Sequence, residues 1–245
     1  MVKISIIIPT LNEEKYLERL LKSIEKQDFE DYEIIVSDSN SDDNTMEIAK
    51  KYGAKIVTGE KKGPGYARNL GAKKANGEYL LFIDADVILR DKNTFFKINK
   101  ELKDEKVACG IAISKGCDGN KIENALVTMG LKFYEFLIRM QVPMAPGFFI
   151  FTRKKLFEKV DGFDEELPFC EDLKFIKEIS KFGKSKLLKS KINISSRRLS
   201  DGGFIKITKD YFPSMIAYLI NEDYLKEKFE FNPASSIADN KILKN

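Results

Sequence analysis

The stretch that most constrains this chain is an apolar run that ends in two carboxylates. Tyr79–Ile83 reads as a strand buried on both faces, the kind found inside parallel sheets. Asp84 and Asp86 follow it, and in extended backbone this spacing would place both side chains on one side of the chain. Carboxylate oxygens suit a hard divalent cation such as Mg²⁺ or Mn²⁺. The stretch therefore predicts a cation site at the carboxyl end of a sheet strand, with a plain polar turn as the alternative.

Composition excludes several kinds of chemistry. The 245 residues suffice for one sizeable domain or two small ones, and the net charge of +4 is mild and interspersed. Nothing in this balance calls for nucleic acid, although a basic surface would favour an anionic substrate or membrane face. Histidine is absent, which removes Ser-His-Asp and Cys-His catalysis and every His-ligated metal site. Acid–base chemistry near neutral pH therefore falls to carboxylates, Lys, Tyr or Cys.

The cysteines and the apolar segments bear on location. Cys109, Cys117 and Cys170 are odd in number and lack metal-type spacing, which is typical of a reducing compartment. The short apolar run between Lys3 and Pro9 resembles a first strand more than a signal peptide, and no stretch is long enough to span a bilayer. We therefore expect a cytoplasmic protein.

Strands and helices alternate through the first half of the chain. Ile4 to Ile8, Glu33 to Val36 and Ile56-Val57 read as strands, with helices after each of them. Thr10 or Asn12 is expected to cap the first helix. This alternation predicts an α/β fold in which helices flank a mostly parallel sheet.

The second half is less regular and contains a helix with little polar surface. Ile122 to Met140 is apolar around most of its circumference, with Lys132 and Arg139 on a narrow charged stripe. Such a helix is either buried or lies against lipid. The first alternative is core packing. The second is peripheral contact with an anionic membrane, shared with the apolar segment Phe204 to Ile220.

Several short motifs, in their order, resemble glycosyltransferase family 2 with the GT-A fold. The resemblance covers roughly Val2 to Arg198 and rests on Ser5 to Glu13, Asp38 to Thr45, Ala67-Arg68-Asn69, Asp84-Ala85-Asp86, Gly162 to Glu165 and Glu171-Asp172. It implies a Rossmann-like, mostly parallel sheet with a smaller acceptor-side subdomain. It also implies an inverting hexosyltransferase that moves a sugar from a nucleotide-diphosphate donor, with Mg²⁺ or Mn²⁺. We expect residues 1–110 to bind the nucleotide sugar, 111–200 to form the acceptor-binding and catalytic half of the same domain, and 201–245 to form a helical extension and tail.

The resemblance assigns donor-binding residues to the ends of the first strands. Asp43 is one of them, with neighbouring Asp42 as an alternative. The family loop usually has paired Asp before a Gly, whereas Ser39 and Asn40 stand at that place here. The expected donor-binding residues are Pro9, Thr10, Glu13, Asp38, Asp43, Arg68 and Asp84.

The catalytic groups are expected further along the chain. Asp86 is the expected direct metal ligand, while Asp84 either assists it or meets the ribose. Inversion needs a base, which we assign to Asp172 with Glu171 as its substitute. Arg197 and Arg198 read either as a phosphate clamp or as a solvated basic turn.

The expected partners follow from this assignment. They are a nucleotide-sugar donor and either an acceptor hydroxyl or a lipid-linked phosphate or glycan, met at the inner face of the membrane if the helix from Ile122 is interfacial. One alternative is a nucleotidyltransferase that makes nucleotide sugars, but Pro9 to Asn12 is not the Gly-rich phosphate loop that such an enzyme needs. The other alternative is a non-catalytic nucleotide or glycan binder.

Overall fold

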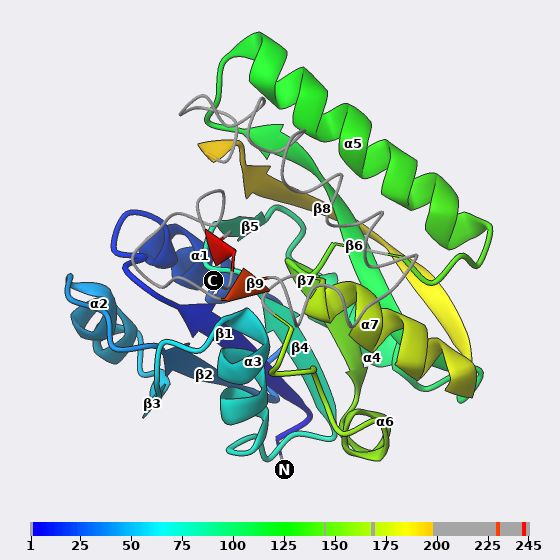
Figure 1. The fold of residues 1–245 in the computed structure, drawn as a ribbon, viewed down its shortest axis with the longest axis horizontal. Coiled ribbons are helices and arrows are strands. Elements are labelled where there is room, and N and C mark those ends of the chain that lie inside the picture. Colours follow the sequence, from blue (N-terminus) through cyan, green and yellow to red (C-terminus); the bar gives the residue numbers. More distant parts are fainter. Residues whose placement is uncertain (1, 145, 168–169, 198–228, 231–241, 244–245) are drawn as a thin grey trace.

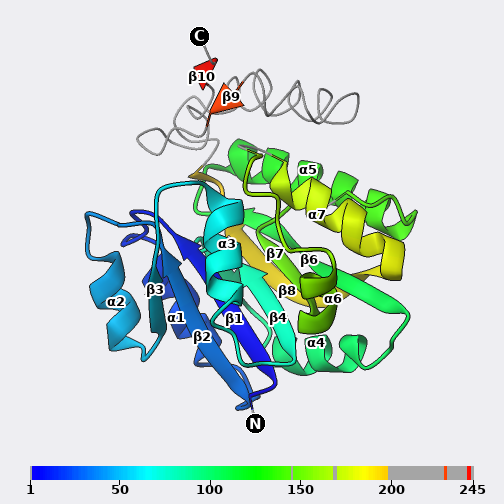
Figure 2. The same ribbon diagram turned by 60° about the horizontal axis from the view of Figure 1, so that its bottom comes forward.

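One eight-stranded sheet carries the fold. The computed structural model describes residues 2–144, 146–167 and 170–197, with the short segments 229–230 and 242–243. The strand order is β3-β2-β1-β4-β7-β6-β8-β5, and Figures 1 and 2 show helices on both faces of this sheet. The strands are β1 (Ile4–Thr10), β2 (Tyr32–Asp38), β3 (Lys55–Thr58), β4 (Tyr79–Ile83), β5 (Val87–Leu89), β6 (Val107–Cys117), β7 (Phe149–Arg153) and β8 (Lys184–Ser195).

Seven helices and one short 3₁₀ turn, η1 (Ser180–Phe182), connect these strands within the described residues. The short strands β9 (Phe229–Glu230) and β10 (Ile242–Leu243) pair with each other in a separate antiparallel sheet. The helices are α1 (Leu17–Ile24), α2 (Thr45–Lys51), α3 (Pro64–Ala72), α4 (Thr94–Leu102), α5 (Lys121–Arg139), α6 (Lys154–Lys159) and α7 (Glu171–Ile179).

The half of the sheet formed by β3, β2, β1 and β4 is entirely parallel. β7 then runs antiparallel to both β4 and β6, while β6 and β8 are parallel to each other. The prediction of a mostly parallel sheet flanked by helices is therefore confirmed. Because β1, β2 and β4 point the same way, Thr10, Asp38 and Ile83 end at one edge of the sheet.

Two apolar clusters hold the layers together, one on each face of the sheet. Side chains of α1 and α4, such as Leu20 and Phe95, pack on one face. Those of α3, α6 and α7 pack on the other, where Phe163 and Phe175 stack with ring centroids 4.3 Å apart. Figure 2 shows α3, α6 and α7 together on that second face. The predicted site residues lie at the edge of the sheet, between these layers.

Some expectations about local structure are wrong. Thr10 and Asn12 do not cap α1, which begins later, after Tyr16. Their side chains are engaged by the loop after β2 instead. The sequence pattern also missed β5, β7 and α4. Among the described residues, no helix combines the length and the apolar character needed to cross a bilayer.

Candidate active site

The loop after β2 is tied to the end of β1 by a buried aspartate. Thr10 Oγ1 donates to Asp38 Oδ1 at 2.9 Å, and the Ser41 amide donates to Asp38 Oδ2 at 2.8 Å. Both carboxyl oxygens of Asp38 thus accept hydrogen bonds inside the protein, and Asp38 is only 1% exposed. Pro9, just before Thr10, lies opposite Ser37 in the parallel register. Asp38 therefore shapes the loop at the predicted nucleotide site, where it is largely covered by its own partners.

Asp43 fixes the far side of the same loop. It accepts hydrogen bonds from the backbone amides of Glu14 and Thr45, both at 3.0 Å, and from the Thr45 hydroxyl. Burial alone would raise the pKa of Asp43, but these hydrogen bonds outweigh it and the pKa is lowered. Asp42 is exposed and lies 3.2 Å from Lys61 Nζ. The two neighbouring aspartates thus have different environments, with Asp43 structural and Asp42 accessible.

Arg68 joins the strand-end carboxylates to the start of α7. Its Nη1 donates to Glu171 Oε1 at 2.6 Å, and its Nη2 lies 3.1 Å from Asp84 Oδ1. The guanidinium also lies 5.3 Å from the centroid of the Phe163 ring and is 3% exposed. Arg68 is therefore neither a surface residue nor an open nucleotide contact in this structure. It neutralises two carboxylates that come from distant segments.

Glu171 and Asp172 form a tightly packed acidic pair at the first turn of α7. Burial raises the pKa of both, the charge of Asp172 adds to the effect on Glu171, and Arg68 opposes it. Asp172 is half-buried, and the backbone at Gly147 approaches it closely. A Cβ at residue 147 would lie 2.8 Å from Asp172 Oδ2, so only glycine fits beside this carboxylate. A carboxyl group with a raised pKa is suited to proton transfer.

Arg197 forms the second arginine bridge of the site. Its Nη1 and Nη2 contact the two carboxyl oxygens of Glu13 at 2.7 and 2.8 Å. Its Nε lies 2.9 Å from Asp86 Oδ2, and its guanidinium lies 4.4 Å from the centroid of the Tyr16 ring. Arg197 is thus not a solvated turn residue. It is a cation held over Asp86.

The carboxylate oxygens of Asp84 and Asp86 are the type of ligand that a divalent cation prefers. The two side chains do not, however, lie on one side of an extended chain as predicted. The chain turns after β4, where the Val87 amide donates to the Asp84 carbonyl, and the two carboxylates meet different arginines. Hard oxygen donors at a strand end suit Mg²⁺ or Mn²⁺. Within the described residues, no group of three or more His, Cys, Asp or Glu side chains is arranged for a metal. A cation at Asp86 would therefore need further oxygens from the donor, and Arg197 would have to yield its place.

The structure brings together most of the predicted site residues. Arg68 joins the end of β4 to the first turn of α7, and Arg197 joins the segments after β1, β4 and β8. The end of β2 is joined to β1 by the hydrogen bond from Thr10 to Asp38. Arg198 lies outside the described residues. Sequence reasoning missed Tyr16, beneath Arg197, and Gly147, beside Asp172. Pro146-Gly147 is a turn signal that could have drawn attention to the second, whereas Tyr16 carried no signal of its own.

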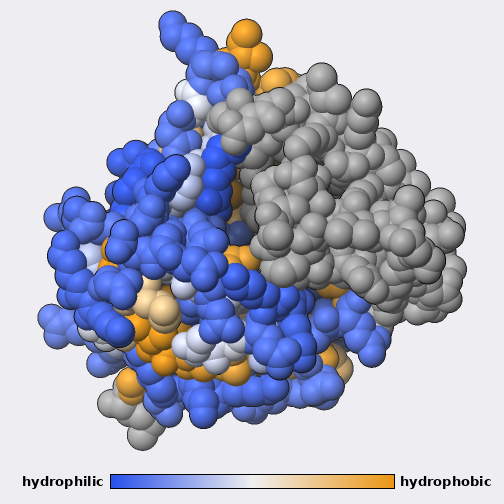
Figure 3. Space-filling model, turned by 60° about the vertical axis from the view of Figure 1, so that its left-hand side comes forward, coloured by the Kyte–Doolittle hydropathy of each residue, from blue (hydrophilic) through white to orange (hydrophobic). Residues whose placement is uncertain are grey.

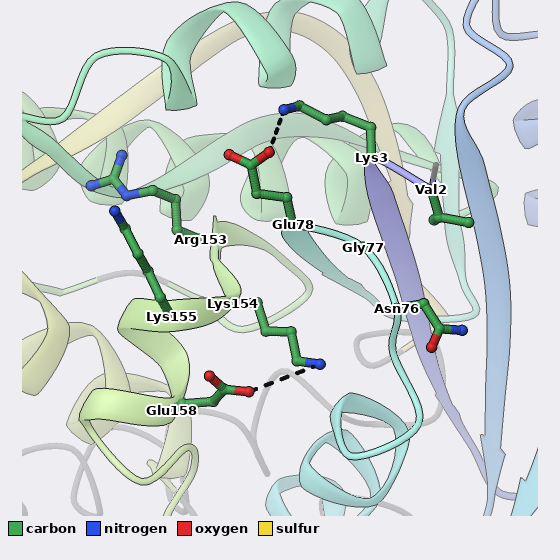
Figure 4. Close-up of a pocket in the computed structure, with 9 residues that line it drawn as sticks. All are labelled: Val2, Lys3, Asn76, Gly77, Glu78, Arg153, Lys154, Lys155 and Glu158. Carbon is green, nitrogen blue, oxygen red and sulfur yellow. Dashed lines mark hydrogen bonds and ion pairs between the residues drawn. The ribbon is translucent and has the colours of Figure 1, made fainter.

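The pocket drawn in Figure 4 is separate from this site. Val2, Lys3 and Glu78 line it at the opposite ends of β1 and β4, together with Arg153 and Lys154 near the start of α6. Two of its basic groups are engaged within the protein, because Lys154 Nζ donates to the Ala75 carbonyl and Arg153 donates to carbonyls from Leu102 to Val107. It therefore does not contribute to the arrangement around Asp86 and Asp172.

The fold is that of the GT-A class, which the solved structures described here share. The chain belongs to glycosyltransferase family 2, because the sequence model "Glycosyl transferase family 2" matches residues 5–161. Among solved structures, TarS residues 1–349 of S. aureus in complex with UDP superposes with a TM-score of 0.65 at 27% identity, covering 79% of this chain and 60% of that one. A mannosyltransferase of Pyrobaculum calidifontis, solved with GDP-Man and Mn²⁺, has a TM-score of 0.69, covering 87% of this chain and 64% of that one. At 20% identity it supports the fold alone.

Curated relatives match about a third of the chain. The poly(ribitol-phosphate) beta-N-acetylglucosaminyltransferase TarS of Staphylococcus aureus is 43% identical over 94 residues, which are 35% of this chain and 16% of that protein. A GalNAc(5)-diNAcBac-PP-undecaprenol beta-1,3-glucosyltransferase of Campylobacter jejuni is 41% identical over 95 residues, 35% of this chain and 30% of that protein. The aligned region thus spans less than a third of either relative.

Proposed function

We propose that this protein is an inverting glycosyltransferase that moves a sugar from a nucleotide-diphosphate donor to an acceptor hydroxyl or a lipid-linked phosphate or glycan. The observation that carries the proposal is the bridge through Arg68, which links Asp84 to Glu171 beside Asp172. This bridge supports the proposal because it joins a carboxylate proposed to bind the cation to the acidic pair proposed to supply the base. The alternatives, a nucleotidyltransferase or a non-catalytic binder, find no support among the relatives described above, which are named as glycosyltransferases.

The nucleotide binds at the ends of β1 and β2 in this proposal. The loop that Asp38 and Asp43 hold together forms the wall of that site, with Pro9 and Thr10 beneath it. TarS has been solved with UDP, so a uridine donor is the first to test. Glu13 is the remaining donor residue, and it becomes available when Arg197 releases it.

The diphosphate lies beside Asp84 and Asp86. A divalent cation bound there would neutralise the charge that develops on the leaving group. Arg197 already holds a positive charge at this place, and the diphosphate oxygens would take over its guanidinium from Glu13 and Asp86. Arg197, which the carboxylates had held, then clamps the leaving group.

Asp172 acts as the base. The acceptor oxygen attacks the anomeric carbon while the bond to the diphosphate breaks, and the acceptor's proton passes to the Asp172 carboxylate. Glu171 is held by Arg68 at 2.6 Å and therefore serves as a positioning residue. The raised pKa of Asp172 makes it a better proton acceptor than an ordinary aspartate.

A transfer and hydrolysis assay tests the proposal. UDP-, GDP- and dTDP-sugars are incubated with the full chain and Mn²⁺, and sugar release is followed for the wild type, Asp172→Asn and Glu178→Gln. We expect Asp172→Asn to keep its donor affinity and to lose roughly 10²–10⁴-fold in turnover. Glu178→Gln, near the far end of the same helix, controls for the loss of a carboxylate. No turnover with any donor, or an Asp172→Asn variant as fast as the wild type, would contradict the assignment.

A further inference from the structure

The outward face of α5 is unusually apolar. Its inner side packs on β6 and β8 through the buried Leu131 and Ile138. With 3.6 residues per turn, five large apolar side chains fall within an arc of about 60° on the side opposite those two. They are Ile122, Met129, Phe133, Phe136 and Met140, which are 72%, 66%, 55%, 57% and 63% exposed.

We call these five side chains the α5 stripe. They are exposed and do not belong to the apolar core. A helix that served only for packing would expose polar side chains on its outer side. Only two other large hydrophobic side chains of the described residues are exposed, Phe96 at 51% and Phe182 at 39%, and they lie on separate elements. By contrast, the side of the molecule shown in Figure 3 is mainly hydrophilic over its described residues. The expectation that this helix is wholly buried is therefore wrong for its outer side.

Basic residues follow one edge of the α5 stripe. Lys121, Lys132 and Arg139 are exposed, and their spacing places them along a single line of the helix. The two acidic residues of the helix lie away from the α5 stripe and make other contacts. Glu123 closes the capping box at the helix start, and Glu135 accepts from Arg139 at 2.6 Å. An apolar stripe with a basic edge matches a lipid surface that carries negative headgroups.

Both ends of α5 connect to the candidate active site. Near the first turn, Ser196 Oγ donates to Asn124 Oδ1 at 2.7 Å, and Ser196 directly precedes Arg197. Beyond the last turn, the chain leads to Gly147, which packs against Asp172 and whose carbonyl accepts from Arg68. The helix that carries the α5 stripe is therefore tied at both ends to segments of the site, one that leads to Arg197 and one that packs against Asp172.

We infer that the α5 stripe docks the protein peripherally on an anionic membrane and so brings a lipid-linked acceptor to Asp172. This rests on the proposed function, because it names where the acceptor of that reaction is met. The apolar side chains enter the headgroup region and the basic edge meets the anionic headgroups. Binding is therefore reversible and weakens with salt.

Vesicle flotation of the full chain tests the inference. The protein is mixed with phosphatidylcholine vesicles, with or without phosphatidylglycerol, at low and at high salt. We expect flotation with the anionic vesicles at low salt and its loss at high salt. Combining Phe133→Gln with Phe136→Gln should lower the bound fraction by roughly tenfold or more. Phe96→Gln, 51% exposed on α4, is the matched control and should float like the wild type.

Each other occupant of the α5 stripe gives a different result. A wild type that never floats, or a double variant that floats equally well, overturns the inference. If light scattering shows a dimer that the double variant dissociates, a second copy covers the stripe. If residues 122–140 are protected from hydrogen exchange without lipid and no flotation occurs, the remainder of this chain covers it. Sugar release from UDP-sugars in solution needs no vesicles, so its failure would count against the proposed function alone.

Discussion

One buried arginine and one half-buried arginine hold the carboxylates of the site. Arg68 lies between Asp84 and Glu171, and Arg197 lies between Glu13 and Asp86. The sequence predicted each of these carboxylates as a site residue, but not which arginine each one contacts. Glu13 and Arg197, for example, are 184 residues apart in the chain. It also predicted that Thr10 or Asn12 caps the first helix. Instead, Thr10 donates to Asp38 and Asn12 accepts from the Asp42 amide.

Replacing Arg68 should destabilise the protein in a way that depends on pH. Arg68→Met leaves Glu171 and Asp84 without their buried cation, which should cost about 3–5 kcal/mol of unfolding free energy near pH 8. The pKa values of Glu171 and Asp172 are raised, so the folded chain binds protons more tightly than the unfolded chain. Stability therefore falls as pH rises above the ordinary carboxyl range of about 4, and it should fall more steeply without Arg68.

Urea unfolding at pH 5 and pH 8 measures this effect. The control is Arg139→Met, which breaks the exposed pair with Glu135 and should cost about 0.5 kcal/mol at either pH. An Arg68→Met penalty as small as that of the control, or one that grows toward low pH, would show that Arg68 does not neutralise these carboxylates.

Asp86→Ala should uncouple donor binding from the metal. In the wild type we expect Mn²⁺ to strengthen UDP binding, since Asp86 supplies a ligand at the diphosphate. In the variant the ratio of affinities with and without Mn²⁺ should fall to about one. Isothermal titration calorimetry gives both affinities, and Glu47→Gln on α2 serves as an exposed carboxylate control. A metal-linked affinity that survives in Asp86→Ala would remove Asp86 from the cation site.

At the scale of elements, hydrophobic periodicity predicted the bounds of helices and strands better than it predicted which of their sides face solvent. Tyr79–Ile83 matches β4, and the apolar repeat from Ile122 matches α5 within a residue at each end. The repeat did not reveal which side of α5 is outward, because both sides are apolar. β7 was not predicted as a strand, since its run of apolar residues has no alternation.

The turn before β7 positions the base. Gly147→Ala would place a Cβ 2.8 Å from Asp172 Oδ2 and push the carboxylate aside. Because a displacement of about 1 Å can cost roughly 10²-fold, we expect kcat to fall by that order with little change in donor affinity. Gly130→Ala on α5, where a Cβ meets nothing within 4 Å, is the control and should raise helix stability by about 1 kcal/mol. Equal kcat values for the two variants would show that Gly147 does not position Asp172.

At the scale of the molecule, one sheet spans the predicted donor and acceptor halves. β4 from the first half pairs with β7 from the second, and β6 crosses the predicted boundary at residue 110. The sequence motifs could predict this shared domain because their order follows the family. They could not predict the segment of β8 from Lys184, where charged residues hide the strand pattern.

A shared sheet implies cooperative unfolding of residues 1–200. We expect differential scanning calorimetry to show one main transition, because neither half can lose its strands without exposing the core of the other. Saturating UDP with Mn²⁺ should shift that whole transition upward. Two separate transitions, with only one moved by the nucleotide, would mean that the halves fold as independent units.

The stereochemistry of sugar release tests the central claim most directly. UDP-α-GlcNAc is mixed with the protein and Mn²⁺, and the anomeric proton of the released sugar is followed by NMR before mutarotation. If Asp172 activates water as it would activate an acceptor, the β-anomer appears first, and its formation is lost in Asp172→Asn. Release of the α-anomer first, or release that continues unchanged in Asp172→Asn, would contradict an inverting reaction at this site.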